Sequence, residues 1–269
     1  MHRLRMTLAY DGRAFHGWQR QPGMLTVQGA LDGALSTIYQ AEIQTAGASR
    51  TDAGVHAWAQ VAAFNAPKER DLRKVLNAVN ALTPPELLLR DIHDVDPSFD
   101  PRRDAIGKHY RYLLWQGREL PPTLLGRAWA VPPLDLQAMR EAAAALHGEH
   151  DFSSFRASDC QAATPHRRLD SITLDTAEAP YPARFANESS ALIQIDVRGN
   201  AFLKNMVRIL VGSLVEVGRG KQPPSWMSTL LAVCDRTQAG PTAIAPGLTL
   251  CAVHYQNTNN KSKQSEYTP

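Results

Sequence analysis

The chain has 269 residues, of which 43% are hydrophobic and 20% charged, and its formal net charge is +3. This length suffices for one large domain or two ordinary domains, each with its own core, and we expect two. A net charge this small does not by itself indicate nucleic-acid binding. The N-terminus offers no apolar signal segment, and no stretch approaches the roughly 18 uncharged apolar residues of a membrane span, so we expect a cytoplasmic protein without membrane contact.

The cysteines and the charges indicate what kinds of site the protein can carry. Cys160, Cys234 and Cys251 are odd in number and widely spaced, without a CxxC pair, which indicates reduced thiols and no zinc site. Basic residues outnumber acidic ones in 102–127 and 198–221, whereas 86–100 is acidic. This segregation predicts one cationic face on the folded protein.

Strands and helices are mixed in the first part of the chain. Leu4, Met6 and Leu8 alternate with polar residues, which predicts a half-buried strand over residues 4–10. Thr26 precedes apolar residues at helical spacing and is the predicted N-cap of a helix that follows it. Further patterns predict a strand over 59–64, a helix over 72–82 and a strand over 87–95.

The second part repeats this style. We expect a strand around 110–114, a helix capped by Asp135 that runs to residue 146 and is ended by Gly148, and strands over 171–175, 191–198 and 248–255. Asn200 is the predicted cap of the helix with the strongest pattern in the chain, which Gly218 ends. These patterns fit two α+β lobes, 1–104 and 105–256, with a cleft between them, and a disordered tail over 257–269.

The run ASRTDAGVHA, residues 48–57, has no apolar periodicity and places Asp52 between Arg50 and Gly54. A glycine lets the backbone bend sharply, and a nearby guanidinium keeps a carboxylate ionised, so Asp52 could serve as a nucleophile. The structural alternative is a turn or helix N-cap. A metal site with His56 is disfavoured, because Gly54 opposes a helix there and no third ligand is near. Arg50 can pair with Asp52 or with a phosphate.

Two other segments carry candidate residues. In GKHYRYLLW, Tyr110 stands among Lys108, His109 and Arg111, a composition suited to stacking a base while cations hold phosphates. Alternatively, Tyr110 simply faces the core, as aromatic residues of half-buried strands often do. In the helix expected after residue 200, Lys204 and Arg208 would share a face, either as a solvated basic stripe or with Arg208 pointing into the cleft.

Together these residues resemble the TruA family of tRNA pseudouridine synthases, from about residue 3 to residue 255. The motifs that carry the resemblance are long and occur in one order: YDGRAFHGWQRQ, TVQGALDGAL, SRTDAGVHAWAQVAAF, SFDPRRDAIGKHYRY, GEHDFSSFR, GNAFLKNMVRILVGSLVEVGRG and PGLTLCAVHY. Two positions depart from the family pattern, where Ser49 replaces a usual glycine and His109 a usual arginine.

The resemblance implies roles for individual residues. Asp52 would be the catalytic aspartate and Arg50 its cationic partner, which also helps to hold the base out of the helix. Tyr110 would stack on the target uracil, Arg208 would pair near the aspartate, and Leu248 would pack against the base. The implied fold is a pair of α+β lobes, each with a mainly antiparallel sheet and flanking helices, around an active-site cleft.

The resemblance also implies an activity. The family isomerises uridine to pseudouridine at positions 38, 39 and 40 of the tRNA anticodon arm, needs no cofactor and works as a homodimer. Two other classes compete with this interpretation. A nucleosidase or RNA glycosylase would use the same carboxylate to activate water and would release free uracil. A pure RNA-binding module would use Asp52 only as a turn residue.

Overall fold

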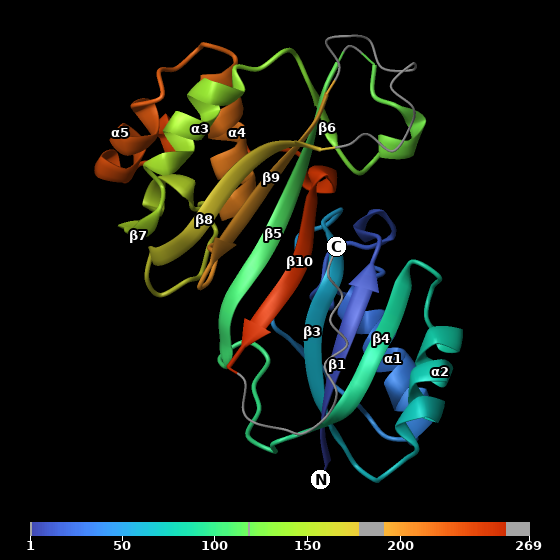
Figure 1. Ribbon diagram of the computed structural model, residues 1–269. Helices are drawn as coiled ribbons and strands as arrows, with labels where there is room; N and C mark the ends of the chain where they lie inside the picture. Colours follow the sequence, from blue (N-terminus) through green and yellow to red (C-terminus); the bar gives the residue numbers. More distant parts are fainter. Residues whose placement is uncertain (1, 118, 178–190, 257–269) are drawn as a thin grey trace.

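The computed structural model describes residues 2–117, 119–177 and 191–256 of the chain (Figure 1). The tail over 257–269, predicted to be disordered, lies outside the described residues. The elements in chain order are β1 (His2–Tyr10), η1 (Gly12–Ala14), α1 (Val27–Tyr39), β2 (Ala46–Gly47), β3 (His56–Ala66), α2 (Leu72–Leu82), β4 (Leu87–Val95), β5 (Ala105–Gln116), η2 (Pro122–Leu124), β6 (Trp129–Val131), α3 (Leu136–Ala144), β7 (Gly148–Asp151), η3 (Ser153–Phe155), β8 (His166–Ala177), β9 (Ala191–Gly199), α4 (Met206–Gly218), α5 (Trp226–Val233), η5 (Arg236–Gln238), η6 (Ala245–Gly247) and β10 (Leu248–Tyr255).

The described strands join in one continuous sheet with the order β4-β1-β3-β10-β5-β9-β8-β7. Most neighbours are antiparallel, but β10 runs parallel to β3 over the short register Thr249↔His56 and Leu250↔Ala57. On its other side β10 pairs antiparallel with β5. A strand from late in the chain therefore lies between the two parts of the sheet. The division into lobes 1–104 and 105–256 stays a proposal.

The helices gather in two groups along this sheet. Figure 1 shows α1 and α2 beside β1, β3 and β4, and α3, α4 and α5 beside β7, β8 and β9. Most buried hydrophobic side chains form one main cluster that spans both groups, from Leu4 on β1 to Val253 on β10. The α+β class expected from the sequence is confirmed.

The sequence predicted the longer strands, whereas the short strands β2, β6 and β7 were not predicted. On β1 the buried residues are the alternating set that includes Leu4, Met6 and Leu8. The helix α1 begins after Thr26, whose side chain accepts a hydrogen bond from Gly29 N at 3.2 Å. The bounds of α2, β4 and β10 are those that the sequence predicts. Strand β3 begins three residues earlier than expected, at His56.

The start of α4 differs from the prediction. The helix begins at Met206, and Asn205 before it has a left-handed φ of 61°. Asn200 does not cap it, because its side-chain oxygen accepts hydrogen bonds from the backbone of Arg168 and Ala201 instead. Residues 200–205 are therefore irregular, and Lys204 does not share a helix face with Arg208.

One predicted helix end is corrected, and the end of α4 at Gly218 is confirmed with a different cap residue. Helix α3 stops at Ala144, and Gly148, with a φ of 103°, begins β7 rather than ending the helix. Gly218 is the last residue of α4, and the left-handed residue is Gly220, with a φ of 70°. The amide of Gly220 bonds to Val217 O and that of Lys221 to Glu216 O, the pattern of a Schellman cap.

Helix α4 approaches the 240–243 segment closely at Gly212. A Cβ added at Gly212 would lie 1.8 Å from Pro241 O, so one backbone must shift to admit a side chain. We expect Gly212→Ala to lower the free energy of unfolding by about 2–3 kcal/mol. Gly33, in the middle of α1, has no atom within 4 Å of such a Cβ. Gly33→Ala should raise the free energy of unfolding by about 0.5–1 kcal/mol, because alanine has the higher helix propensity. Urea midpoints that shift in opposite directions for the two variants would confirm both expectations.

Candidate active site

Residues 48–55, which we call the site loop, connect β2 to β3 and form part of a cleft of about 980 Å³. The same cleft is lined by Tyr110 of β5, Leu248 of β10, and residues 200–208 before and in α4. Each of the site residues expected from the sequence therefore lines one cavity: Arg50, Asp52, Tyr110, Arg208 and Leu248.

A tight turn sets the direction of Asp52. Val55 N donates to Asp52 O at 3.1 Å, and Gly54 inside the turn has a φ of 81°. A positive φ at the third residue of a turn is typical of type II, where glycine is favoured. The bend expected at Gly54 is thus present. A turn at Asp52 is also what the non-catalytic interpretation of this residue predicted. The Asp52 side chain is nevertheless 29% exposed and lines the cleft.

Buried side chains beneath the site loop hold its backbone. Gln60 is fully buried, accepts a hydrogen bond from Ser49 N at 3.1 Å and donates to Ser49 O at 2.6 Å. The hydroxyls of Tyr10 and Thr51 are hydrogen bonded at 2.8 Å. Both strands under the loop, β1 and β3, therefore fix residues on either side of Arg50.

The segment YDGRAFHGW, residues 10–18, packs directly against the site loop. Trp18 N donates to Thr51 O at 3.0 Å. A Cβ at Gly12 would lie 2.1 Å from Val55 O, and one at Gly17 would lie 2.8 Å from Thr51 O. The glycines of this motif thus permit a backbone-to-backbone approach that no other residue type allows.

The Asp52 carboxylate pairs with Arg208. Arg208 Nη1 lies 3.2 Å from Asp52 Oδ2, and the same nitrogen donates to Asn205 Oδ1 at 3.0 Å. Arg208 Nε donates to Ala243 O at 2.7 Å, so the guanidinium is held from several directions. Of the two orientations that the sequence left open for Arg208, the structure has the one directed into the cleft.

Arg50 lies apart from this ion pair. It is exposed and lines the cleft, whereas the guanidinium that contacts Asp52 belongs to Arg208. The sequence allowed Arg50 to pair with Asp52 or with a phosphate, and the first of these pairings is not the one observed. The motif resemblance implied a partner role for both arginines, and the ion pair in the structure is the one with Arg208, 156 residues away from Asp52 in the chain.

Tyr110 presents a buried aromatic ring at the cleft. It is 8% exposed and packs edge-on against Phe202, with ring centroids 5.2 Å apart. Burial raises the pKa of Tyr110 to about 12, and the nearby Asp52 carboxylate acts in the same direction. The neighbouring Tyr112 is fully buried and donates to Ile244 O at 2.7 Å. Both rings face inward, but Tyr110 is the one that lines the cleft.

The basic neighbours of Tyr110 separate onto two faces of β5. His109 and Arg111 point away from the Tyr110 face, as strand alternation requires, and both bind the Asp196 carboxylate. Although burial opposes it, their hydrogen bonds lower the pKa of Asp196 to about 2. The expectation that all three basic residues surround one base-stacking ring is therefore wrong for His109 and Arg111.

Lys108 shares the Tyr110 face. Its ammonium donates to Ala48 O at 2.7 Å, and the cleft beside it is also lined by Arg102 and Arg167. Burial, together with these two arginines, lowers the pKa of Lys108 to about 8. Lys204, at another edge of the cleft, forms an ion pair with Asp159.

Other site types find no support in the described residues. They contain no group of three or more histidine, cysteine or acidic residues that could hold a metal ion. No helix among them is long and apolar enough to cross a membrane.

Comparison with known proteins identifies the family. The sequence profile of tRNA pseudouridine synthases matches residues 6–102 and 142–256. The chain belongs to this family. The tRNA pseudouridine synthase A of Bordetella petrii is 43% identical over 95% of this chain and 92% of its own length. That of Myxococcus xanthus is 42% identical over 96% and 93%, and that of Geobacter sulfurreducens is 40% identical over 95% and 100%.

Several contacts of the site could not be read from the sequence. Asn205, predicted to lie inside a helix, precedes it and holds Arg208. Ala243 contributes only a backbone oxygen, which no side-chain pattern reveals. Lys108 had a usable signal, because it stands two residues before Tyr110 in a strand and therefore on the same face.

Arg208 offers a test of the site geometry. We expect Arg208→Lys to lower the single-turnover rate of pseudouridine formation by about 10–100-fold, because a lysine cannot hold Asp52, Asn205 and Ala243 O in one planar fork. Arg219→Lys, near the other end of α4, is the matched control and should stay within twofold of wild type. Equal rates for the two variants would contradict the importance of the observed pair.

Proposed function

We propose that this protein converts uridine to pseudouridine at positions 38, 39 and 40 of the tRNA anticodon arm, with Asp52 as the nucleophile. The observation that carries the proposal is the Asp52 carboxylate, paired with Arg208 and lying in one cleft with Tyr110 and Leu248. Family membership supports the reaction, and the relatives' names give tRNA as their substrate. The choice of positions rests on the motif resemblance.

The reaction needs only groups of these types. The bond between N1 and C1′ of the ribose breaks, the uracil turns, and a new bond forms between C5 and C1′. One bond to C1′ is thus replaced by another. A proton leaves C5 and N1 gains one, so the isomerisation has no net redox change and no second substrate. Asp52 attacks either C6 of the ring or C1′ of the ribose, and in both routes an ionised carboxylate is required. Arg208 Nη1 lies 3.2 Å from Oδ2 of the Asp52 carboxylate.

Binding the base requires a ring and cations. A uridine in a helix must leave its stack, which costs a few kcal/mol. The buried Tyr110 ring offers a stacking face for the extruded uracil, with Leu248 against it, while Arg50 helps to hold the base out of the helix. Lys108, Arg102 and Arg167 line the same cleft and suit the phosphates on either side of the target.

The remaining partners follow from the same proposal. The protein acts on tRNA in the cytoplasm and forms a homodimer in which both subunits contact one tRNA. Each subunit divides into the lobes 1–104 and 105–256 around the cleft. Sedimentation of the free protein and of its tRNA complex measures the stoichiometry directly.

The first test concerns Asp52. We expect wild type to release tritium from transcripts labelled at C5 of uridine, and Asp52→Asn, which keeps the side-chain shape but loses the charge, to release at least about 10³-fold less. Transcripts with a single uridine at 38, 39 or 40 locate the activity. Both proteins should bind the transcript with similar affinity.

The same assay separates the competing classes. A glycosylase would yield free uracil and an abasic ribose instead of pseudouridine. A binding module would retain affinity in both proteins and change no uridine. Either result would overturn the isomerase proposal.

Lys108 tests the phosphate contacts. Because its pKa is about 8, Lys108 carries a charge below that pH and loses it above. We expect tRNA affinity to fall as pH rises through about 8, and Lys108→Met to bind more weakly at pH 7 without that inflection. The slope of log affinity against log salt should drop by about one. Lys68 is exposed and lies outside the cleft, so Lys68→Met should change neither the affinity for tRNA nor the salt slope.

A further inference from the structure

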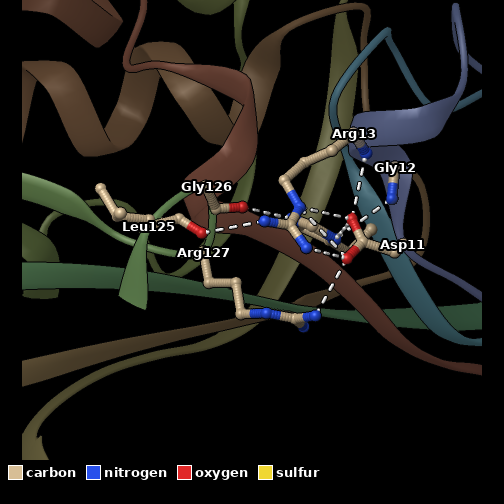
Figure 2. A network of polar contacts seen from close by, with 7 residues as sticks. Asp11, Gly12, Arg13, Leu125, Gly126 and Arg127 are labelled. Carbon is tan, nitrogen blue, oxygen red and sulfur yellow. Dashed lines mark hydrogen bonds and ion pairs between the residues drawn. The ribbon is translucent and has the colours of Figure 1, made fainter. Parts of the chain in front are cut away.

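A network of polar contacts joins the end of the site loop to a segment much later in the chain (Figure 2). The buried residue His56 follows the site loop directly. Its Nδ1 lies 3.1 Å from Gly12 N, and its Nε2 lies 2.9 Å from Gly126 O. Gly12 follows β1, whereas Gly126 lies between η2 and β6, so one imidazole ring bridges two parts of the chain that are far apart in sequence. We call these contacts the His56 network.

The partners of His56 define its tautomer. A backbone N–H can only donate and a carbonyl can only accept, so in the neutral ring Nδ1 accepts from Gly12 and the proton lies on Nε2. The same Nδ1 also lies 3.2 Å from Asp11 Oδ1, with which it would form an ion pair if the ring were protonated. Burial lowers the pKa of His56, which favours this neutral ring. The charged groups around it are Asp11 and Arg13 on one side and Arg127 on the other. A neutral histidine therefore satisfies both backbone groups at once.

Ion pairs reinforce the same bridge. The Asp11 carboxylate accepts from Arg13 Nη2 at 2.6 Å and from Arg127 Nη2 at 2.9 Å. The hydrogen bonds from Arg13 lower the pKa of Asp11 to about 2. Arg13 Nη1 also donates to Leu125 O at 3.2 Å. Figure 2 shows Asp11, Gly12 and Arg13 facing Leu125, Gly126 and Arg127 across this contact.

The backbone at Gly126 has a conformation that this approach of Arg13 requires. Gly126 has a φ of 68°, and a Cβ there would lie 2.3 Å from Arg13 Cδ. Any other residue would be strained and would push Arg13 aside. The 125–127 segment is thus shaped to receive the side chains that come from beside the site loop.

The position of the network matters because the candidate site is divided. Asp52 comes from the site loop, four residues before His56, whereas Tyr110, Arg208 and Leu248 come from residues after 104. Catalysis depends on the distances between these two sets, and a displacement of about 1 Å can cost a hundredfold in rate.

We propose that His56 is a positioning residue for the reaction, whose hydrogen bond to Gly126 O sets the place of the Asp52 carboxylate relative to Tyr110 and Arg208. This inference rests on the proposed function. His56 does not touch the substrate in this scheme, and it acts through the site loop. Neither of its ring nitrogens takes part in proton transfer.

Two variants test the two hydrogen bonds of His56, to Gly12 N and to Gly126 O, separately. The side-chain oxygen of Asn reaches roughly the place of Nδ1, so His56→Asn keeps the acceptor for Gly12 N and loses the bond to Gly126 O. The side-chain nitrogen of Gln reaches roughly the place of Nε2, so His56→Gln keeps the bond to Gly126 O. We expect the single-turnover rate of His56→Asn to fall by at least about tenfold and that of His56→Gln to stay within about threefold. The dissociation constant for tRNA should change less than twofold in both.

Stability and hydrogen exchange provide the controls. Ser154→Ala removes one buried hydrogen bond, to Leu230 O, between two residues that do not line the cleft, and should lower the melting temperature without lowering the rate. Amide exchange at Trp18 and Val55, which bond to Thr51 O and Asp52 O, should rise in His56→Asn and not in His56→Gln.

Equal rates for the two His56 variants, or rate losses that follow the melting temperature, would overturn the inference. Unchanged exchange at Trp18 and Val55 in His56→Asn would overturn it as well. If wild type forms no pseudouridine, the proposed function fails, and the exchange comparison still decides whether His56 positions the site loop.

Discussion

The candidate site depends on one ion pair that joins residues 156 positions apart, Asp52 and Arg208. Arg208 is a fixed partner, because Asn205 Oδ1 and Ala243 O hold its guanidinium at the same time. The pair is only partly exposed, at 29% for the Asp52 side chain and 16% for that of Arg208. The Asp52 carboxylate is thus paired with a cation and still reachable from the cleft, which is the combination that a nucleophile needs. The sheet, the glycine-rich approach of residues 10–18 and the irregular segment before α4 all contribute to bringing these two groups together.

Strand alternation sorts the charges around that pair. On β5, the face that carries Tyr110 also carries Lys108, which lies at the cleft with Arg102 and Arg167 and has a backbone oxygen as its hydrogen-bond partner. On the opposite face of β5, His109 and Arg111 are both paired with the Asp196 carboxylate. Positive charge is thus left available on the face where a polyanion would bind, although the net charge of the whole chain is only +3.

Local patterns predicted most of the fold because they depend on periods of two or 3.6 residues. Strand β1 and helix α2 follow such periods, and their caps are short-range signals. The start of α4 escaped prediction because Asn205 adopts a left-handed conformation that its sequence neighbours do not announce. In the site, Asp52 and Tyr110 could be proposed from their surroundings and from the motif resemblance. The contact from Arg208 to Ala243 O could not, because a backbone oxygen carries no signature in the sequence.

The place of β10 in the sheet has a consequence for synthesis. This strand, Leu248–Tyr255, lies between β3, which continues from the site loop, and β5, which carries Tyr110. In the described sheet, the two sets of strands meet through β10. While a ribosome is still making the chain, the strands before residue 248 can pair within their own sets, but the aspartate and the aromatic ring have no strand to join them. A nascent chain therefore carries every proposed site residue except Leu248 before the strand that joins the two parts of the sheet has been made.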